Sequence, residues 1–279
     1  MHIVDTHLHL VYPDRFAYPW IEEVPPLQGA WTAEAYFDRA VPLGISAALH
    51  MEVDVAEAQI AEESRFMAGV HPRIAGVIAA CRPERADFAE QLDRLSDLAA
   101  LRGLRRVLHV VPDDVSQSET FRANIAALAA RGLSFDLCVR ADQLPLAIAL
   151  ADAAPDTVMV LDHCGVPTMQ PEDFDRWAGD VADLARRGNV MGKISGVIAY
   201  GGEGPPEQRL RPYVEHMVAC FGWDRLVWGS DHPVCTLGAP LEDWVATTHR
   251  LLEGCSEAEV AALLHRNAQR IYRLGEIES

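Results

Sequence analysis

The sequence lacks the basic clusters and the long apolar segments that direct a chain to nucleic acid or into a membrane. Acidic residues outnumber basic ones by 41 to 24, and the formal net charge of −17 disfavours binding to phosphates or to anionic membrane surfaces. No uninterrupted apolar run approaches the roughly 20 residues of a membrane-spanning helix. The first residues contain no basic stretch followed by an apolar one, so we expect no secretion signal. These absences favour a small-molecule substrate over a nucleic-acid or membrane partner.

Cysteine is sparse and is never arranged as a Cys-x-x-Cys pair. The six cysteines lie far apart, and several stand inside apolar runs, such as Cys138. This spacing favours buried, reduced thiols over a disulfide framework, so we expect a cytoplasmic protein. The composition is compatible with a monomer and with a homodimer.

Short apolar runs typical of strands alternate with longer helical stretches along the whole chain. The eight predicted strands cover residues 3–9, 46–51, 74–80, 104–110, 134–139, 158–162, 190–195 and 225–229. Each gap leaves room for a helix, which is the pattern of βαβ units with a parallel sheet. No linker divides the chain, so we predict one α/β domain over residues 1–279. Eight such units favour a (β/α)8 TIM barrel, although an open doubly wound sheet has the same local pattern.

The stretches between the predicted strands carry helix signals. Predicted helices cover residues 55–68, 83–102, 119–130 and 257–264. Glycines close the first three, and Ser256 and Glu259 form a capping-box pattern before the last. Two irregular segments, 11–31 and 196–206, follow the first and seventh strands and would lie at the mouth of the barrel, where substrates bind. Surface decoration is the alternative, but the aromatic residues of 11–31, including Trp20, favour a pocket wall.

The strongest local signal is the pair His7 and His9 near the end of the first strand. Residues two apart in a strand point to the same side, so both imidazoles project into the barrel. Such a pair can bind a divalent ion or polarise a carbonyl oxygen. Alone it is weak evidence, because packed structural histidines are common.

Two later strands also end in polar residues. Asp162 and His163 follow one apolar run, and Asp231 follows another. Each residue could simply cap the segment that follows it, which is the usual role of an Asp in such a place. Three independent strand ends nevertheless deliver acid–base or metal-binding groups to one rim. We therefore predict a reacting centre built from His7, His9, His163 and Asp231.

This combination resembles the amidohydrolase superfamily. The similarity is to its lactonase-type branch, which includes L-fuconolactonase, L-rhamnonolactonase and 2-pyrone-4,6-dicarboxylate lactonase. Besides the site residues, it includes the stretches Lys-Ile-Ser-Gly at 193–196 and Trp-Gly-Ser-Asp-His-Pro-Val-Cys at 228–235. The resemblance covers nearly the whole chain and implies a metal-dependent-hydrolase type of barrel.

The resemblance also implies roles for the four strand-end residues. The family's metal and catalytic positions fall on His7, His9, His163 and Asp231. It implies a single divalent ion, Zn or Mn, held by His7, His9 and Asp231, with His163 as a further candidate ligand; members that work without metal are also known. The fourth strand ends without a lysine and the fifth without a histidine, which argues against a dinuclear centre.

Five further residues are predicted to contact substrate: Trp20, Arg105, His109, Lys193 and His232. Arg105 and His109 have the same parity on the fourth predicted strand, so one face would present both. For Lys193, a structural ion pair inside the barrel is an equal alternative. His232 stands where the family often has tryptophan. His50, at the end of the second strand, is expected to be packed.

The function implied is hydrolysis of a lactone of the sugar-acid or pyrone-dicarboxylate type, and hence a role in carbohydrate metabolism. Asp231 would activate water, and the histidines or an ion they hold would polarise the carbonyl. Amide hydrolysis and metal-dependent decarboxylation are alternatives on the same site. A catalytically inactive binding barrel is an alternative of another class, which the retention of all four polar residues disfavours.

Overall fold

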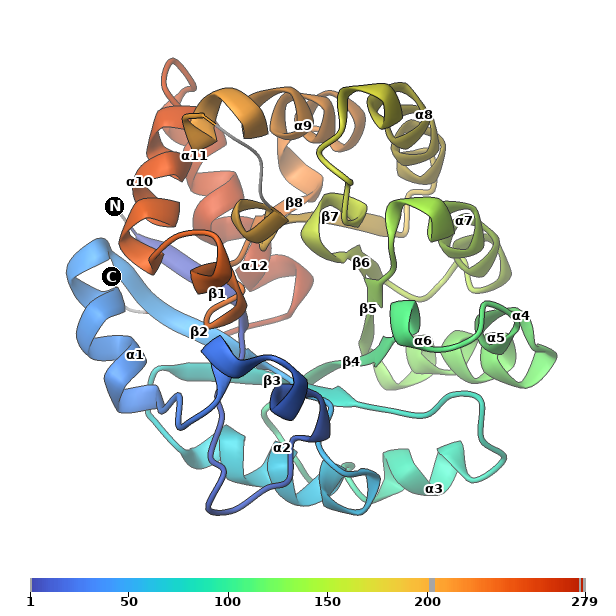
Figure 1. Ribbon diagram of the computed structural model, residues 1–279. Helices are drawn as coiled ribbons and strands as arrows, with labels where there is room; N and C mark the ends of the chain where they lie inside the picture. Colours follow the sequence, from blue (N-terminus) through green and yellow to red (C-terminus); the bar gives the residue numbers. More distant parts are fainter. Residues whose placement is uncertain (1, 201–203, 276, 278–279) are drawn as a thin grey trace.

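One parallel sheet of eight strands forms the centre of the molecule (Figure 1). The computed structural model describes residues 2–200, 204–275 and 277. Each strand pairs with its neighbour in the sequence, in the order β1 to β8. The strands are β1 Ile3–Leu8, β2 Ile45–Met51, β3 Ile74–Ala80, β4 Leu101–Val107, β5 Ser134–Cys138, β6 Met159–Leu161, β7 Val190–Ile194 and β8 Leu226–Trp228.

The first and last strands come together and close the sheet. The amide of Asp231 donates to the carbonyl of His7 and the amide of His9 donates to that of His232, each at 2.8 Å. The hydroxyl of Thr6 also donates to the carbonyl of Trp228 at 2.8 Å. The predicted TIM barrel is therefore confirmed, and the open doubly wound sheet is excluded.

Helices surround the barrel on its outside (Figure 1). They are α1 Ala33–Ala40, α2 Ile60–Gly69, α3 Phe88–Asp93, α4 Asp114–Gln117, α5 Glu119–Ala126, α6 Leu128–Arg131, α7 Leu144–Ala153, α8 Phe174–Ala185, α9 Pro206–Phe221, α10 Leu241–Leu251, α11 Glu257–Ala261 and α12 Asn267–Ile271. No helix in these ranges is long and apolar enough to cross a membrane.

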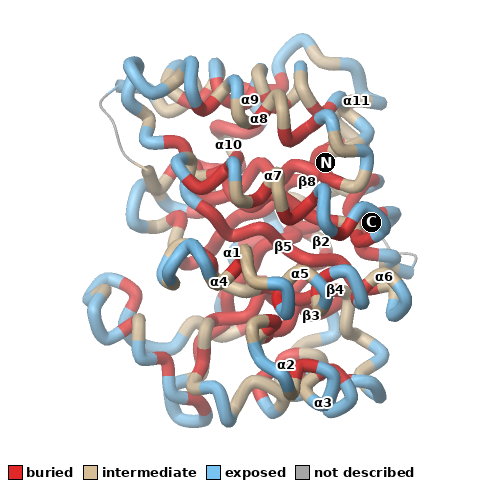
Figure 2. Tube along the Cα trace, turned by 90° about the vertical axis from the view of Figure 1, so that its right-hand side faces the viewer, coloured by how far each residue is buried: buried red, intermediate tan, exposed pale blue. Residues whose placement is uncertain are grey.

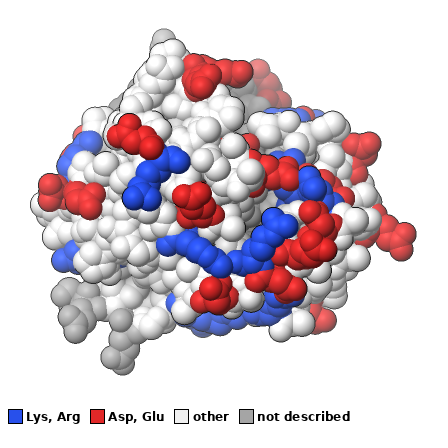
Figure 3. Space-filling view, turned by 90° about the horizontal axis from the view of Figure 1, so that it is seen from below, with Lys and Arg blue, Asp and Glu red and all other residues white. Residues whose placement is uncertain are grey.

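Amphipathic helices explain how the outer layer is held to the barrel. In α8 the buried residues are Trp177, Val181, Leu184 and Ala185, which recur at helical spacing along one face. The tube in Figure 2 shows the same arrangement for the whole molecule, with buried strands inside and exposed segments outside. One face of the surface carries acidic and basic side chains mixed together (Figure 3), so this face offers no continuous field of one sign.

The predicted helix signals are confirmed at two places and wrong at one. Gly132 ends α6 in the left-handed conformation, with φ of 63°, and Ser256 and Glu259 form the capping box before α11. Of the predicted helix 83–102 only α3 forms: residues 83–87 and 94–100 adopt turns and irregular backbone, and residues 101 and 102 already belong to β4. The strand predicted at 104–110 is consequently displaced, and residues 108–110 form a 3-10 turn. His109 therefore lies on this turn and not on the strand.

Candidate active site

The four predicted site residues meet at the carboxyl-terminal end of the barrel. His7 lies on β1, and His9 follows that strand directly. His163 belongs to the turn Asp162–Gly165 after β6, and Asp231 follows β8. All four side chains are almost completely buried. The strand ends of a parallel barrel converge on one rim, which is why residues so distant in the sequence become neighbours.

The side chains face one another at short range. The Nε2 atoms of His7 and His9 are 3.2 Å apart. Asp231 Oδ1 lies 3.6 Å from the first of these nitrogens and 3.4 Å from the second. On the other side of the carboxylate, Oδ2 is 3.9 Å from His163 Nδ1. One carboxylate thus contacts three imidazoles.

Unusual backbone conformations aim two of these side chains inward. His163 has φ of 54° and Asp231 has φ of 58°, in the left-handed region that costs a residue with a side chain about 1–3 kcal/mol. Gly196, with φ of 64°, lies against both. A Cβ at this glycine would come within 2.5 Å of His163 Nδ1 and 2.6 Å of Asp231 Oδ2. Only glycine therefore leaves room for the pair.

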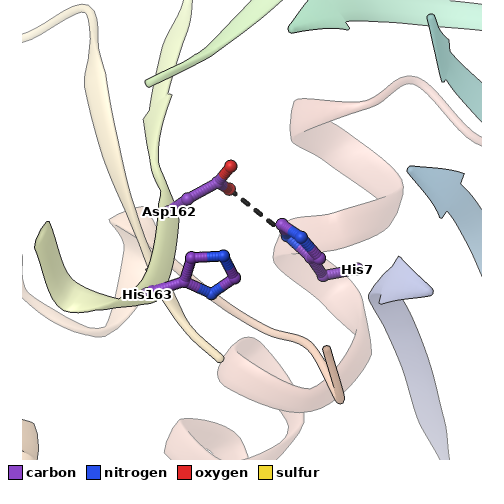
Figure 4. A group of neighbouring side chains, drawn as sticks. All are labelled: His7, Asp162 and His163. Carbon is purple, nitrogen blue, oxygen red and sulfur yellow. Dashed lines mark ion pairs between the residues drawn. The ribbon is translucent and has the colours of Figure 1, made fainter. Parts of the chain in front are cut away.

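A buried ion-pair cluster lies beneath His7. Asp162 Oδ1 is 3.4 Å from His7 Nδ1, the contact drawn in Figure 4. Lys193 Nζ lies 2.8 Å from Asp162 Oδ1 and 2.5 Å from Asp136 Oδ1, and Tyr272 donates its hydroxyl to Asp136. The lysine and both carboxylates are fully buried. Lys193 therefore forms the structural ion pair that was the alternative to a substrate contact, and its position does not support the prediction that it contacts substrate.

Arg105 reaches the site from β4 and is held there by Glu52. Its Nε lies 2.6 Å from Glu52 Oε1, and its Nη2 donates to the Glu52 carbonyl at 2.9 Å. The remaining Nη1 lies 3.3 Å from His7 Nε2. Burial alone would lower the pKa of Arg105, but the attraction of Glu52 and Asp162, together with the hydrogen bond to Glu52, raises this pKa overall. A permanent positive charge thus faces the histidines.

Burial determines the protonation of the site. It lowers the pKa of His9 to about 3, lowers that of His7 well below its usual value, and lowers that of His163. All three imidazoles are therefore neutral at neutral pH. Burial also raises the pKa of Asp231 to about 6, against the attraction of His163 and Arg105. Asp231 is mostly ionised at pH 7, but its affinity for a proton is greater than that of an exposed carboxylate.

The positions of the hydrogen atoms follow from the contacts of each ring. His9 Nδ1 lies 3.1 Å from the Met51 carbonyl, which can only accept, so His9 Nε2 carries a lone pair. We assign the same tautomer to His7, because its Nδ1 faces Asp162 and its Nε2 faces the guanidinium of Arg105, which can only donate. The ammonium of Lys193, also near His7 Nδ1, can turn its hydrogens toward its two carboxylates.

His7, His9 and Asp231 fit a divalent metal ion. Two nitrogen lone pairs and a carboxylate oxygen converge, with separations of 3.2, 3.4 and 3.6 Å. Ligands that share a tetrahedral ion at about 2.1 Å are about 3.4 Å apart. The Nδ1 atom of His7 contacts the Asp162 carboxylate and that of His9 contacts the Met51 carbonyl, as is usual for metal-binding histidines. His7, Asp162 and His163 form a second such group around the same histidine.

A cavity of about 400 Å³ opens onto the site. Its lining includes His9, His163, Asp231 and three of the predicted substrate contacts, Arg105, His109 and Trp20. His232, by contrast, is absent from this lining. Its ring packs behind the site between Trp31 and Tyr36, at 5.2 Å from each ring centroid. The prediction that His232 contacts substrate is therefore not supported by its position.

Several site residues were not predicted from the sequence. Asp162 was considered only as a cap, and Glu52 was not considered, although both directly follow a strand, as the predicted residues do. Tyr200 and Arg140 also line the cavity. Tyr200 lies in segment 196–206, of which residues 201–203 are outside the described residues. His50 is buried and lies 3.2 Å from Glu63, as expected for a packed histidine.

The chain is similar to known proteins along almost its whole length. The model of the amidohydrolase family matches residues 4–274. An L-fucono-1,5-lactonase of Burkholderia multivorans is 28% identical, and the match covers 98% of this chain and 96% of that protein. An L-fucono-1,5-lactonase of Burkholderia ambifaria is 29% identical over 74% and 72% of the two chains. A crystal structure of a Burkholderia multivorans amidohydrolase with bound zinc has a TM-score of 0.90 at 26% identity, covering 99% of this chain and 100% of that one.

Proposed function

This chain belongs to the amidohydrolase family, and we propose that it opens a lactone ring by adding water to the ester carbonyl. The observation that carries the proposal is the buried carboxylate of Asp231, which faces three neutral imidazoles at the floor of a cavity. Water held in that cavity would lie against Asp231 as the base on one side and against the hydrogen-bond donors Arg105 and His163 on the other. The same arrangement is needed to attack an ester carbonyl.

Asp231 is the proposed general base. Its raised pKa of about 6 is close to neutral pH, where a base is both ionised and able to take a proton. The proton leaves water as the oxygen–carbon bond forms, and the charge moves onto the carbonyl oxygen. The carboxylate can then return the proton to the ring oxygen when the ester bond breaks. The product is a hydroxy acid.

Arg105 and His163 are the proposed groups that stabilise the charge on the carbonyl oxygen. Both line the cavity, and both are fixed by other contacts: Arg105 by Glu52, and His163 by Ser195, whose Oγ lies 2.9 Å from His163 Nδ1. Donors that are already oriented need no rearrangement during the reaction, and one such donor is worth about 3–4 kcal/mol in acyl transfer. A divalent ion, held by His7, His9 and Asp231, would add Lewis-acid polarisation of the carbonyl when bound.

A sugar-acid lactone is the proposed substrate class. The cavity of about 400 Å³ suits a small ring compound, because small-molecule sites usually measure about 300–1,000 Å³. Its walls combine the aromatic rings of Trp20 and Tyr200 with the polar groups of Asp54 and Arg140. Aromatic faces and charged groups together match a ring that carries hydroxyls. Two relatives named L-fucono-1,5-lactonase support the same class.

A lactone panel followed by proton release at constant pH tests the proposal. We expect acid release from one or a few sugar lactones, and its loss in Asp231→Asn. The same samples are assayed for carbon dioxide with aromatic carboxylates and for amine release with cyclic amides. Turnover of those compounds without any lactone turnover would replace lactone hydrolysis by decarboxylation or amide hydrolysis. Chelation before the assay then shows whether a metal ion contributes.

A further inference from the structure

Arg105 places a fixed positive charge against the atoms that would hold a metal ion. Its Nη1 lies 3.3 Å from His7 Nε2, the same distance range that separates the three candidate ligands from one another. We propose that Arg105 competes with a divalent ion for His7 and thereby sets how tightly the site holds metal. This role of Arg105 extends the proposed function to metal binding, and it rests on that function only because the two proposals concern the same site.

The competition follows from the single lone pair on His7 Nε2. With Nδ1 protonated toward Asp162, the imidazole has one acceptor position left, which can accept from the guanidinium or bind an ion, but not both. His9 contributes its Nε2 lone pair in either state, because its other nitrogen donates to the Met51 carbonyl. Metal binding therefore requires His7 to give up the contact with Arg105.

Glu52 keeps Arg105 from moving aside. Its Oε1 pairs with Arg105 Nε and its backbone carbonyl accepts from Nη2, while its Oε2 accepts from the amide of Asp54 at 2.7 Å. The side chains of Glu52 and Arg105 are only 1% and 6% exposed. An ion at His7 would thus remain close to an unmoved positive charge where water is scarce, and like charges repel strongly under these conditions.

The site therefore contains a permanent positive charge of its own, the guanidinium of Arg105. Without metal, Arg105 supplies the positive charge beside His7 and reaches the cavity where the carbonyl would bind. When a metal ion is bound, the ion supplies the positive charge beside His7. Removing the charge of Arg105 should therefore increase the affinity for zinc, whereas removing an ordinary supporting residue of a metal site decreases affinity.

Zinc titration of the chelator-stripped protein tests this directly. Wild type is compared with Arg105→Met, which keeps an unbranched apolar stem without the charge, and with Arg106→Met as the matched control. Arg106 is the next residue of β4 and pairs with Glu84 instead, at 3.0 Å. By calorimetry we expect Arg105→Met to bind zinc at least about tenfold more tightly than wild type, and Arg106→Met to match wild type. Equal or weaker binding in a folded Arg105→Met protein would overturn the proposal.

Two additional variants are needed. The first addresses the Glu52 carboxylate, which Arg105→Met leaves without its partner, and the second addresses where the zinc binds. The double variant Glu52→Gln/Arg105→Met removes both charges, so no buried carboxylate is left unpaired and none is newly free to bind zinc. We expect it to bind zinc more tightly than wild type as well, and it decides the question if the single variant does not fold. Adding His9→Asn should abolish the gain; a gain that persists would place the zinc elsewhere and overturn the proposal.

The zinc titration needs no substrate, so its outcome is independent of the reaction. If no lactone is opened, the proposed function fails while the zinc affinities still decide the role of Arg105. If lactones are opened but Arg105→Met gains no zinc affinity, the role of Arg105 fails alone.

Discussion

Replacing Asp231 by asparagine should produce a protein that is inactive and more stable than wild type. Asparagine has the same shape, and its amide group can donate to the nitrogens that face this position, which lie 3.4 and 3.6 Å from the present carboxylate oxygen. A neutral donor replaces a charge that burial disfavours. Activity and stability are therefore expected to change in opposite directions.

The gain in stability can be estimated from the pKa of Asp231. Folding raises this pKa from 3.8 to about 6 because the carboxyl is buried. A tenfold change in proton affinity is worth about 1.4 kcal/mol, so the ionised carboxylate costs about 3 kcal/mol of folding free energy at pH 7.5. The folded state holds the proton more tightly, so this cost appears as the pH rises from about 4 to about 6. At pH 5 the advantage of the asparagine variant should fall to roughly half.

The loss of activity follows from the role of the base. General base catalysis contributes roughly 10²- to 10⁴-fold, and an amide cannot take the proton from water. Because the fold is retained, the loss should lie in kcat and not in the amount of folded protein. Far-UV circular dichroism of the variant should match that of wild type.

Urea unfolding of the metal-free proteins at pH 7.5 and pH 5 measures the predicted difference in stability. The exposed Asp156→Asn serves as the matched control and should leave the free energy of unfolding unchanged at both pH values. An asparagine variant at position 231 that is less stable than wild type at pH 7.5 would refute the reasoning. So would a stability gain that is the same at both pH values, since it would not arise from the charge.

Three further predictions concern the same site. The value of kcat/KM should fall toward acid pH with a midpoint near 6, because Asp231 must be ionised to act as the base; a profile that is flat from pH 5 to pH 8 would contradict this role. Gly196→Ala should abolish turnover, because its Cβ would clash with His163, whereas Gly179→Ala, where nothing lies within 4 Å, should retain wild-type turnover. Lys193→Met should lower the free energy of unfolding by roughly 3–5 kcal/mol, because two buried carboxylates lose their partner; a loss below about 1 kcal/mol by urea titration would argue against the ion-pair cluster.

The four central residues could be predicted from the sequence because of one general property of parallel barrels. All strands end at the same rim, so polar residues that interrupt an apolar run at its carboxyl end converge in space. His7, His9, His163 and Asp231 satisfy this rule without any knowledge of the loops. The rule also applies to Glu52 and Asp162, which directly follow β2 and β6, but a single carboxylate after a strand resembles an ordinary cap.

Side-chain direction could not be predicted where the backbone leaves the strand. His109 does line the same cavity as Arg105, but strand parity is not the reason, because β4 ends at Val107 and His109 lies on the 3-10 turn that follows. His163 and Asp231 point inward because their residues adopt left-handed conformations, which the parity rule does not describe. The helix predicted at 83–102 was wrong because the helix ends at Asp93: residues 94–100 form turns, and Leu101 then pairs with Val77 of β3, a contact that helical composition does not reveal.

The position of Lys193 shows where reasoning from sequence ends and the structure becomes necessary. A lysine on an inward-facing position of β7 can extend toward the substrate or remain inside the barrel, and nothing in its neighbourhood along the chain decides between them. The decision depends on Asp136 and Asp162, which come from β5 and β6 and lie within 2.8 Å of the ammonium. Two carboxylates buried side by side require a cation between them. The lysine is thereby committed to supporting His7 from below, and Arg105, held by its own carboxylate, remains as the positive charge that faces the cavity.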